Sequence, residues 1–313
     1  MRYLVTGCTG YIGRTLLQRL VNEPSSHVVG LDMRIPSGVV SELHGWYPVE
    51  MAIGDPNLPK ALAEAQPDVV FHAAAAPRTA TLAEQLSVNV LGTQHLLESL
   101  VEAQIQARTV VLGSAAEYGL ATQTTPIEED APTRPSGDYG VAKLSQTHSA
   151  LVTGRRYDLP VIVGRLFNVY GCTPNTFVVA SLASQIAQLE QYKGMASRIK
   201  VKNMLAIRDF IHVQDVVSGL IALGLSGKPH EIYHIASAEG VSTQWILDYL
   251  LQHSSLKSPE VFPQGKQLRD VSIARINKIN IHTGWKPALS LSEGLDQELQ
   301  YWREQATLAG LAR

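Results

Sequence analysis

Val5-Thr6-Gly7-Cys8-Thr9-Gly10-Tyr11-Ile12-Gly13 is the stretch that predicts how this chain begins to fold. Residues 3–5 form a short apolar run typical of a buried strand, and Leu16, Leu17 and Leu20 recur afterwards at helical spacing. The glycines therefore stand at a turn from a strand to a helix. They allow a tight turn, close helix packing and close approach of a pyrophosphate, which the free N–H groups and positive dipole end of the helix attract. A glycine-rich turn without a ligand is the alternative.

A carboxylate, Asp32, follows the second predicted strand, residues 27–31. It stands about 20 residues after the glycines, where a dinucleotide-binding fold has the acid that binds the adenosine ribose hydroxyls. Because a carboxylate repels a 2′-phosphate, Asp32 favours NAD over NADP. The nearby Arg34 weakens this preference and keeps NADP as an alternative. A solvated acid at a strand end is the interpretation without a ligand.

The composition is that of an ordinary globular protein of one large or two small domains, with 313 residues, 45% hydrophobic and 17% charged. The net charge of −2 predicts no general attraction to nucleic acid or to anionic membranes. No apolar run reaches the roughly 18 residues of a membrane span. The two cysteines predict neither a disulfide framework nor a zinc site, and the scattered histidines are expected to be packed or exposed. We therefore expect a cytoplasmic protein without a metal.

Strands and helices alternate up to about residue 165, which predicts an α/β fold with a doubly wound parallel sheet. Further strands are expected at residues 49–53, 68–72, 109–112 and 160–164, the last closing the sheet. Asp55, after the third strand, is placed to bind an adenine amino group, with a plain surface turn as the alternative. Ala73, Ala74 and Ala75 follow the fourth strand, where small side chains let either a flat cofactor or a helix lie close to the backbone.

Two long helices are expected in this half of the chain. The first covers residues 82–104, and a buried asparagine such as Asn89 usually satisfies a neighbouring backbone group in such a helix. The second is capped by residues 136–138 and carries Tyr139 and Lys143.

The second half of the chain has shorter elements in a less regular order. Helices are expected at residues 177–191, 216–225, 243–252 and 292–303, and strands at residues 198–201 and 231–235. This pattern predicts a smaller α/β lobe over the carboxyl edge of the sheet. We expect residues 1–166 and about 208–238 to form the dinucleotide-binding domain, and residues 167–207 and 239–313 to form the lobe.

Ser114, Tyr139 and Lys143 carry the predicted chemistry. The serine reaches the carboxyl edge of the sheet, where open α/β sheets bind ligands, and the tyrosine and lysine lie one helical turn apart on one face. A tyrosine hydroxyl with a pKa near 10 is a weak base at neutral pH, and an ammonium on the next turn stabilises its phenolate. The serine can hydrogen-bond the substrate oxygen that gains or loses the proton. The trio predicts hydride transfer at a carbinol or ketone, whereas a Tyr-x-x-x-Lys pair alone often arises by chance.

Further motifs accompany these residues. They are Thr6-Gly7-x-x-Gly10-x-x-Gly13, Phe71-His72-Ala73-Ala74-Ala75, Asn89-Val90-x-Gly92-Thr93, Ser114 ahead of Tyr118-Gly119, Tyr139-Gly140-Val141-Ala142-Lys143, Arg165-x-x-Asn168-Val169-Tyr170-Gly171, Arg208-Asp209-Phe210-Ile211-His212-Val213-x-Asp215-Val216 and Gly284-Trp285-Lys286-Pro287. Over nearly the whole chain the sequence resembles the extended short-chain dehydrogenase/reductases, the NAD-dependent epimerase/dehydratase family. The resemblance implies a Rossmann domain, a C-terminal lobe for a nucleoside-diphosphate sugar, and a homodimer through a four-helix bundle made by residues 82–104 and 139–157.

The resemblance also assigns roles to residues beyond the trio. The expected cofactor-binding residues are Gly7, Thr9, Gly10, Tyr11, Ile12, Gly13, Asp32, Arg34, Asp55, Ala73, Ala74, Ala75, Asn89 and Lys143. The expected substrate-binding residues are Ser114, Ala115, Tyr139, Asn168, Arg208 and Arg269. Arginine suits a diphosphate because its fork pairs two phosphate oxygens, and surface ion pairs are the alternative for both arginines.

The residues that precede Tyr118-Gly119 indicate which members of the family the chain resembles in activity. Dehydratases of the family have an acid two residues before this tyrosine, where the chain has Ala116. Glu117 is shifted by one residue, which turns its side chain to the other face of a strand-like segment, so we expect no dehydratase activity. The catalytic cysteine of 3,5-epimerases is also absent. A 4-ketoreductase or a 4-epimerase remains, and a non-catalytic dinucleotide-binding regulator is less favoured because the trio is present.

Three stretches are most similar to the GDP-4-keto-6-deoxy-mannose reductases: residues 113–119, 184–190 and 201–210. The chain departs from that subfamily at residues 168–171. The loops at residues 169–176 and 239–242 are expected to decide which sugar is bound.

Overall fold

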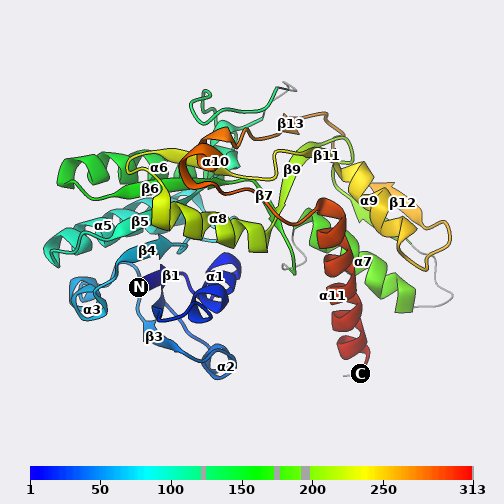
Figure 1. The fold of residues 1–313 in the computed structure, drawn as a ribbon. Helices are drawn as coiled ribbons and strands as arrows, with labels where there is room; N and C mark the ends of the chain where they lie inside the picture. The colour runs from blue at the N-terminus through cyan, green and yellow to red at the C-terminus, as the bar shows by residue number, and fades with distance from the viewer. Residues whose placement is uncertain (121–124, 173–176, 192–197, 312–313) are drawn as a thin grey trace.

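A parallel sheet of seven strands forms the larger part of the protein (Figure 1). The computed structural model describes residues 1–120, 125–172, 177–191 and 198–311. In spatial order the strands are β10 (Ile232–Ile235), β6 (Val161–Leu166), β5 (Arg108–Ser114), β4 (Val69–His72), β1 (Arg2–Thr6), β2 (His27–Asp32) and β3 (Trp46–Glu50). The chain order reverses between β1 and β4, so a crevice opens there at the carboxyl ends of the strands.

Helices cover both faces of this sheet, which confirms the doubly wound fold. One face packs against α1 (Tyr11–Val21), α8 (Val213–Ser226) and α10 (Asn277–Thr283), and the other against α3 (Leu58–Ala65), α5 (Gly92–Glu102) and α6 (Asp138–Tyr157). Neighbouring strand residues enter opposite cores: Val5 and Phe71 belong to the first, Leu4 and Val70 to the second. Burial on both faces explains why these strands are apolar throughout.

A second region lies beside the sheet. It contains the strands β7 (Asn168–Tyr170), β9 (Ile207–His212), β11 (Gly240–Ser242) and β13 (Val271–Ser272), the pair β8 (Arg198–Val201) and β12 (Glu260–Pro263), and the helices α7 (Val178–Gln191), α9 (Thr243–Gln252) and α11 (Leu291–Leu311). The three helices share an apolar core that includes Ile186, Leu247 and Leu295, and Figure 1 shows them on the opposite side of the molecule from α5 and α6. The strand β9 pairs here, although the sequence places residues 208–212 in the larger domain; the domain boundary stays a prediction.

The helix expected over residues 82–104 is present but not uniform. The short α4 (Leu82–Gln85) continues into a π-helical segment, Leu86–Leu91, and then into α5, which ends at Glu102. Asn89 lies in the π-helical segment, fully buried, and its Oδ1 accepts a hydrogen bond from the backbone N–H of Ala76 at 2.9 Å. A buried asparagine that serves a neighbouring backbone group is what the sequence predicts. π-Helical turns often mark functional sites.

Two strand predictions need correction. The third strand spans Trp46–Glu50 and not residues 49–53, because its partner β2 ends at Asp32, which lies opposite Glu50. Pro48 is tolerated within it because β3 is an edge strand. The strand expected at residues 160–164 does not close the sheet, since β10 pairs outside β6.

Three helix predictions also need correction. The helix α6 begins after Gly137, and no side chain caps it, so the expected cap by residues 136–138 is wrong. The helices expected at residues 216–225 and 292–303 are longer, Val213–Ser226 and Leu291–Leu311. No helix within the described part of the chain is long and apolar enough to cross a membrane.

Candidate active site

The turn between β1 and α1 is too tightly packed for any residue but glycine at positions 7 and 13. Gly7 has a φ of +66°, and a Cβ there would lie 2.6 Å from the backbone nitrogen of Ala74. A Cβ on Gly13 would collide with the carbonyl oxygen of Gly7. Gly10 is the N-cap of α1 and leaves the start of the helix without a side-chain cap. An uncapped helix N-terminus behind a glycine cradle is a suitable place for a pyrophosphate.

Asp32 closes the outer side of this turn. Its Oδ2 accepts hydrogen bonds from the backbone N–H of Thr9 at 2.9 Å and from the Thr9 hydroxyl at 2.7 Å. Its Oδ1 accepts one from the N–H of Met33 at 2.8 Å. The half-buried carboxylate therefore stands directly beside the turn, while Arg34 is exposed two residues later. A carboxylate next to a glycine cradle fits the adenosine half of a dinucleotide.

The other expected cofactor residues differ in their surroundings. Ala73 and Ala74 are half-buried and Ala75 is exposed, after the end of β4. Tyr11 is held by its hydroxyl, which donates to the carbonyl of Gly171 at 2.5 Å. Ile12 packs against the first apolar core.

Asp55 is already engaged within a surface turn. Its Oδ1 accepts two hydrogen bonds from Asn57, one from the backbone at 2.8 Å and one from the side chain at 3.0 Å. These bonds show the turn role of one carboxylate oxygen, and the binding of an adenine amino group by Asp55 stays a prediction.

Ser114, Tyr139 and Lys143 meet at the carboxyl edge of the sheet. Ser114 ends β5, and its hydroxyl accepts the N–H of Ala116 at 3.2 Å and hydrogen-bonds Tyr139. Lys143 is only 3% exposed, and its Nζ donates to the carbonyl of Leu112 and, at 2.5 Å, to Oε1 of Gln146. The carboxyl ends of β1, β4 and β5 are adjacent, so the trio lies near the glycine turn.

The environment of Tyr139 acts on its hydroxyl in two opposite directions. Burial raises the pKa of Tyr139, but the positive charges of Lys143 and Arg78 and hydrogen bonds from Ser114 and Arg78 lower it more, so the pKa lies below its ordinary value of 10.0. The guanidinium of Arg78 lies 4.4 Å from the centre of the Tyr139 ring. Burial also lowers the pKa of Lys143. A tyrosine with a lowered pKa is suited to exchange a proton near neutral pH.

A cleft of about 720 Å³ opens over Tyr139. Residues from both regions of the protein line it. They include Arg78, Gln85, Ser114, Ala115, Ala116, Tyr139, Phe167, Asn168, Arg208 and Asp270. The structure thus brings together five of the six residues expected to bind substrate.

The sixth, Arg269, is exposed and lies outside the lining of the cleft. Its neighbour Asp270 holds Arg208 instead, since its carboxylate and carbonyl both accept from the guanidinium. Asn168 donates through Nδ2 to the carbonyl of Asp209 at 3.0 Å. Residues 173–176 of the loop expected to decide the sugar lie outside the described residues.

Glu117 points away from the cleft. It is completely buried, and its Oε2 lies 2.7 Å from Nε of Arg165, which is 2% exposed. Its Oε1 accepts the N–H of Ser114 at 2.8 Å and the hydroxyl of Thr147 at 3.1 Å. Ala116, which stands two residues before Tyr118 where the resemblance implies an acid in dehydratases, lines the cleft. The carboxylate of Glu117 therefore supports the backbone of Ser114 and does not face the cleft.

Three residues of the site, Gln146 and Arg78 beside the trio and Asp270 beside Arg208, escape prediction from the sequence. Gln146 follows Lys143 at helical i+3 spacing, which is a signal that pattern reasoning could have used. Arg78 and Asp270 lie in loops far from α6 along the chain, so no local pattern indicates them.

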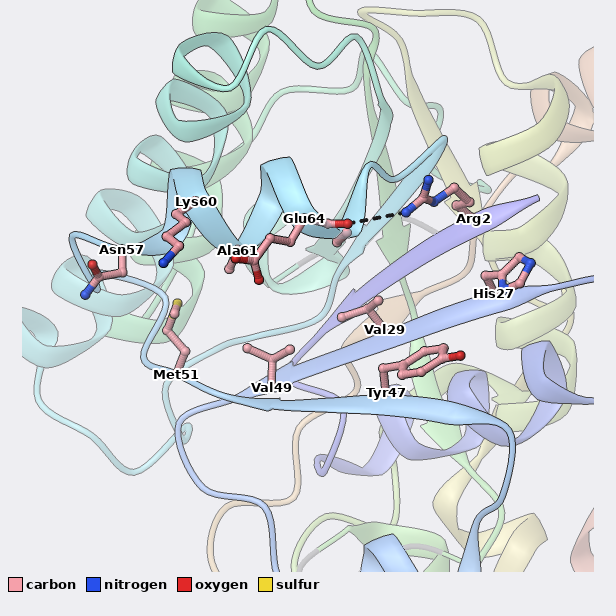
Figure 2. A pocket seen from close by; sticks show the side chains of 11 residues that line it. Arg2, His27, Val29, Tyr47, Val49, Met51, Asn57, Lys60, Ala61 and Glu64 are labelled. Atoms are coloured by element: carbon pink, nitrogen blue, oxygen red, sulfur yellow. Dashed lines mark hydrogen bonds between the residues drawn. The ribbon is translucent and has the colours of Figure 1, made fainter.

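A cavity of about 840 Å³ lies elsewhere, between α3 and the edge of the sheet (Figure 2). Val29, Val49 and Tyr47 come from the strands, and Lys60 and Glu64 come from α3. None of the predicted site residues belongs to its lining. Within the described residues, no group of three or more histidine, cysteine or acidic side chains is arranged to hold a metal.

Known proteins are similar to this chain in sequence and in structure over nearly its whole length. A GDP-6-deoxy-D-mannose reductase of Pseudomonas aeruginosa is 27% identical over 97% of this chain and 98% of the reductase. A UDP-glucose 4-epimerase of Mycolicibacterium smegmatis is 26% identical over 98% of this chain and 100% of the epimerase. The crystal structure of a UDP-glucuronic acid 4-epimerase from Bacillus cereus, in complex with UDP-glucuronic acid and NAD, superposes with a TM-score of 0.85, at 27% identity over 97% of this chain and 100% of that chain.

The family model of the NAD dependent epimerase/dehydratase family matches residues 3–236, well over half of the chain. This range includes the glycine turn, Asp32 and the trio of Ser114, Tyr139 and Lys143. The chain belongs to the NAD dependent epimerase/dehydratase family.

Proposed function

We propose that this protein reduces the C4 ketone of a nucleoside-diphosphate 4-keto-6-deoxyhexose, with a GDP-linked sugar favoured. The observation that carries the proposal is the Tyr139–Ser114 pair, which lies in a cleft also lined by Asn168 and Arg208. The GDP-linked sugar is favoured by the similarity to the GDP-6-deoxy-D-mannose reductase over almost the full length of both chains.

The residues divide the work of such a reduction among them. Tyr139 donates its phenolic proton to O4 while negative charge develops there, and Ser114 orients that oxygen with its hydroxyl. Lys143 lowers the pKa of Tyr139, and we assign it the nicotinamide ribose as well. Arg208 and Asn168 are assigned to the diphosphate and ribose of the sugar nucleotide. The bound nicotinamide supplies the hydride.

The dinucleotide is assigned to the glycine turn. Gly7, Gly10 and Gly13 would receive the pyrophosphate, and Asp32 beside Thr9 would bind the adenosine ribose. An acid at this place favours NAD, with NADP as the alternative because of Arg34.

A 4-epimerase with retained NAD is the second candidate. The similarity to the UDP-glucose 4-epimerase is nearly as high as that to the reductase, and Asp32 suits a tightly bound NAD. In that reaction Tyr139 first removes and then returns the same proton. A 4,6-dehydratase is not favoured, because Glu117 is buried against Arg165.

The test follows NADH and NADPH oxidation by absorbance with the product of a GDP-mannose 4,6-dehydratase as substrate. Stoichiometric oxidation supports the reductase, provided that Tyr139→Phe abolishes it. No oxidation by a protein that purifies with NAD contradicts the reductase and supports the epimerase. In that case GDP- and UDP-hexoses are assayed next for C4 inversion.

We also propose a homodimer through a bundle of α5 and α6 from two copies, in the cytoplasm. The exposed apolar residues Leu91, next to α5, and Val152 on α6 support this assignment. Light scattering of the purified protein tests it, and a Leu91→Glu/Val152→Glu double variant should be monomeric.

A further inference from the structure

A buried chain of polar side chains runs from Lys143 toward the glycine turn. Gln146 donates through Nε2 to the hydroxyl oxygen of Thr93 at 2.8 Å. The same oxygen lies 2.8 Å from Nε2 of His72, and Nδ1 of His72 lies 2.7 Å from the hydroxyl of Thr6. The backbone N–H of Ala74 donates to that hydroxyl at 3.3 Å. All of these side chains are at most 3% exposed, so water does not compete for their hydrogen bonds.

The donors and acceptors of this chain have a single consistent arrangement. The one hydroxyl proton of Thr93 goes to the carbonyl of Asn89 at 2.5 Å, so its oxygen accepts from both Gln146 and His72. His72 therefore carries its proton on Nε2, and its Nδ1 accepts from Thr6. The same bonds fix the orientation of the Gln146 amide. Its Nε2 faces Thr93 and its Oε1 faces Lys143.

The arrangement positions the ammonium instead of moving a proton. An amide donates and accepts at different atoms, so protons do not hop through Gln146 along the chain. A buried ammonium is costly unless its N–H groups have acceptors, and Gln146 and the carbonyl of Leu112 supply two of them.

We propose that Thr6, His72, Thr93 and Gln146 are positioning residues that hold the Lys143 ammonium where it acts on Tyr139. The chain also ties Lys143 to the backbone of Ala74, which packs against Gly7 of the dinucleotide turn. The inference rests on the proposed role of Tyr139 as the acid of the reaction. It gives His72 a task beyond that of the packed or exposed histidine predicted from the sequence. Burial and the charge of Lys143 lower the pKa of His72 to about 3, so this histidine stays neutral at physiological pH.

The test replaces Thr93, the middle of the chain. Thr93→Val keeps the shape and removes the hydroxyl, and Thr93→Ser is the matched control that retains it. The pKa of Tyr139 is measured without substrate, as the tyrosinate absorbance titration of each protein minus that of the same protein with Tyr139→Phe. We expect Thr93→Val to raise this pKa by about one unit and Thr93→Ser to leave it at the wild-type value.

The kinetic readout should move with the titration. The alkaline limb of kcat in Thr93→Val should shift upward by the same amount, while KM for the nucleotide sugar stays unchanged. A folded Thr93→Val protein with the wild-type Tyr139 pKa overturns the inference. If this variant does not fold, Gln146→Met removes Oε1, the acceptor of Lys143 itself, and is judged by the same titration. If the wild-type protein shows no turnover, but the pKa of Tyr139 is still higher in Thr93→Val than in wild type, the proposed function is contradicted and the inference stands.

Discussion

The two sides of the cleft hold their positive charges differently. On the side of Tyr139, Lys143 is buried and donates to the neutral oxygens of Leu112 and Gln146. On the opposite side, the Arg208 side chain is 24% exposed and is paired with Asp270. The first charge is fixed, and low local polarity strengthens its effect on Tyr139, although the buried carboxylate of Glu117 also acts on it. The second is partly neutralised and can exchange partners with an incoming anion.

This difference separates chemistry from specificity. In the proposed mechanism, a fixed ammonium beside Tyr139 would serve the same proton transfer whatever sugar is bound. Arg208 is partly exposed and paired with a carboxylate, so the strength of its contact with a ligand depends on that ligand and on the neighbouring loops. Changes on the Tyr139 side should therefore alter kcat and its pH dependence, whereas changes on the Arg208 side should alter KM.

The largest expected effect is that of Tyr139→Phe. Loss of the only hydroxyl assigned to donate the proton should lower kcat by about 10²- to 10⁴-fold, the usual contribution of general acid catalysis. Dinucleotide affinity, measured by calorimetry, should stay within a factor of two or so of wild type, since the glycine turn is untouched. Turnover at the wild-type rate would remove Tyr139 from the mechanism.

Lys143→Met should have the next largest effect, roughly 10- to 100-fold on kcat at neutral pH. Without the ammonium, burial raises the pKa of Tyr139, so the phenol becomes a weaker acid. Reduction needs the protonated phenol, and its rate falls as pH rises through this pKa. The alkaline limb of kcat should therefore move to higher pH than in wild type. A profile of kcat against pH checks the direction of this shift.

Arg78→Met is the matched comparison for Lys143. Arg78 also lowers the pKa of Tyr139, the effect of its charge being smaller than that of Lys143, and its side chain is exposed to screening ions. We expect a shift of the alkaline limb in the same direction but smaller, and one that shrinks as salt is added. A larger shift for Arg78 than for Lys143 would contradict the comparison between fixed and exposed charges.

Asp32→Asn should change cofactor preference by about tenfold. The amide oxygen can still accept from Thr9, so the variant removes the charge and keeps this contact, while the hydrogen bond from the N–H of Met33 is lost. Repulsion of a 2′-phosphate is thereby lost, and tenfold corresponds to about 1.4 kcal/mol. The ratio of kcat/KM for NADH to that for NADPH should fall. An unchanged ratio would mean that Arg34 or another group sets the preference.

The same contrast explains what the sequence could predict. The glycine turn, Asp32 and the Tyr139–Lys143 pair lie in short stretches whose spacing alone fixes their geometry, and the strands before them are confirmed as β1, β2 and β5. The contacts of Arg208 depend on β9 and the loop before β13, which are about 60 residues apart. No local pattern indicates that Asp270 forms an ion pair with Arg208, or that Arg269 lies outside the lining of the cleft. The limits of β3 likewise depend on where its partner β2 ends.

The smallest expected effect is that of Asp270→Asn. It tests the Arg208 side of the cleft alone. Asp270→Asn removes the charge that competes with a diphosphate for Arg208, while the carbonyl of residue 270 still holds the guanidinium. A partly exposed ion pair is worth up to about 1 kcal/mol, so KM for the nucleotide sugar should fall by about two- to fivefold, with kcat unchanged. Arg208→Met is the control and should raise KM instead. A rise in KM for Asp270→Asn would show that the carboxylate orients Arg208 for the ligand, and the Arg208 side would then be as fixed as the Tyr139 side.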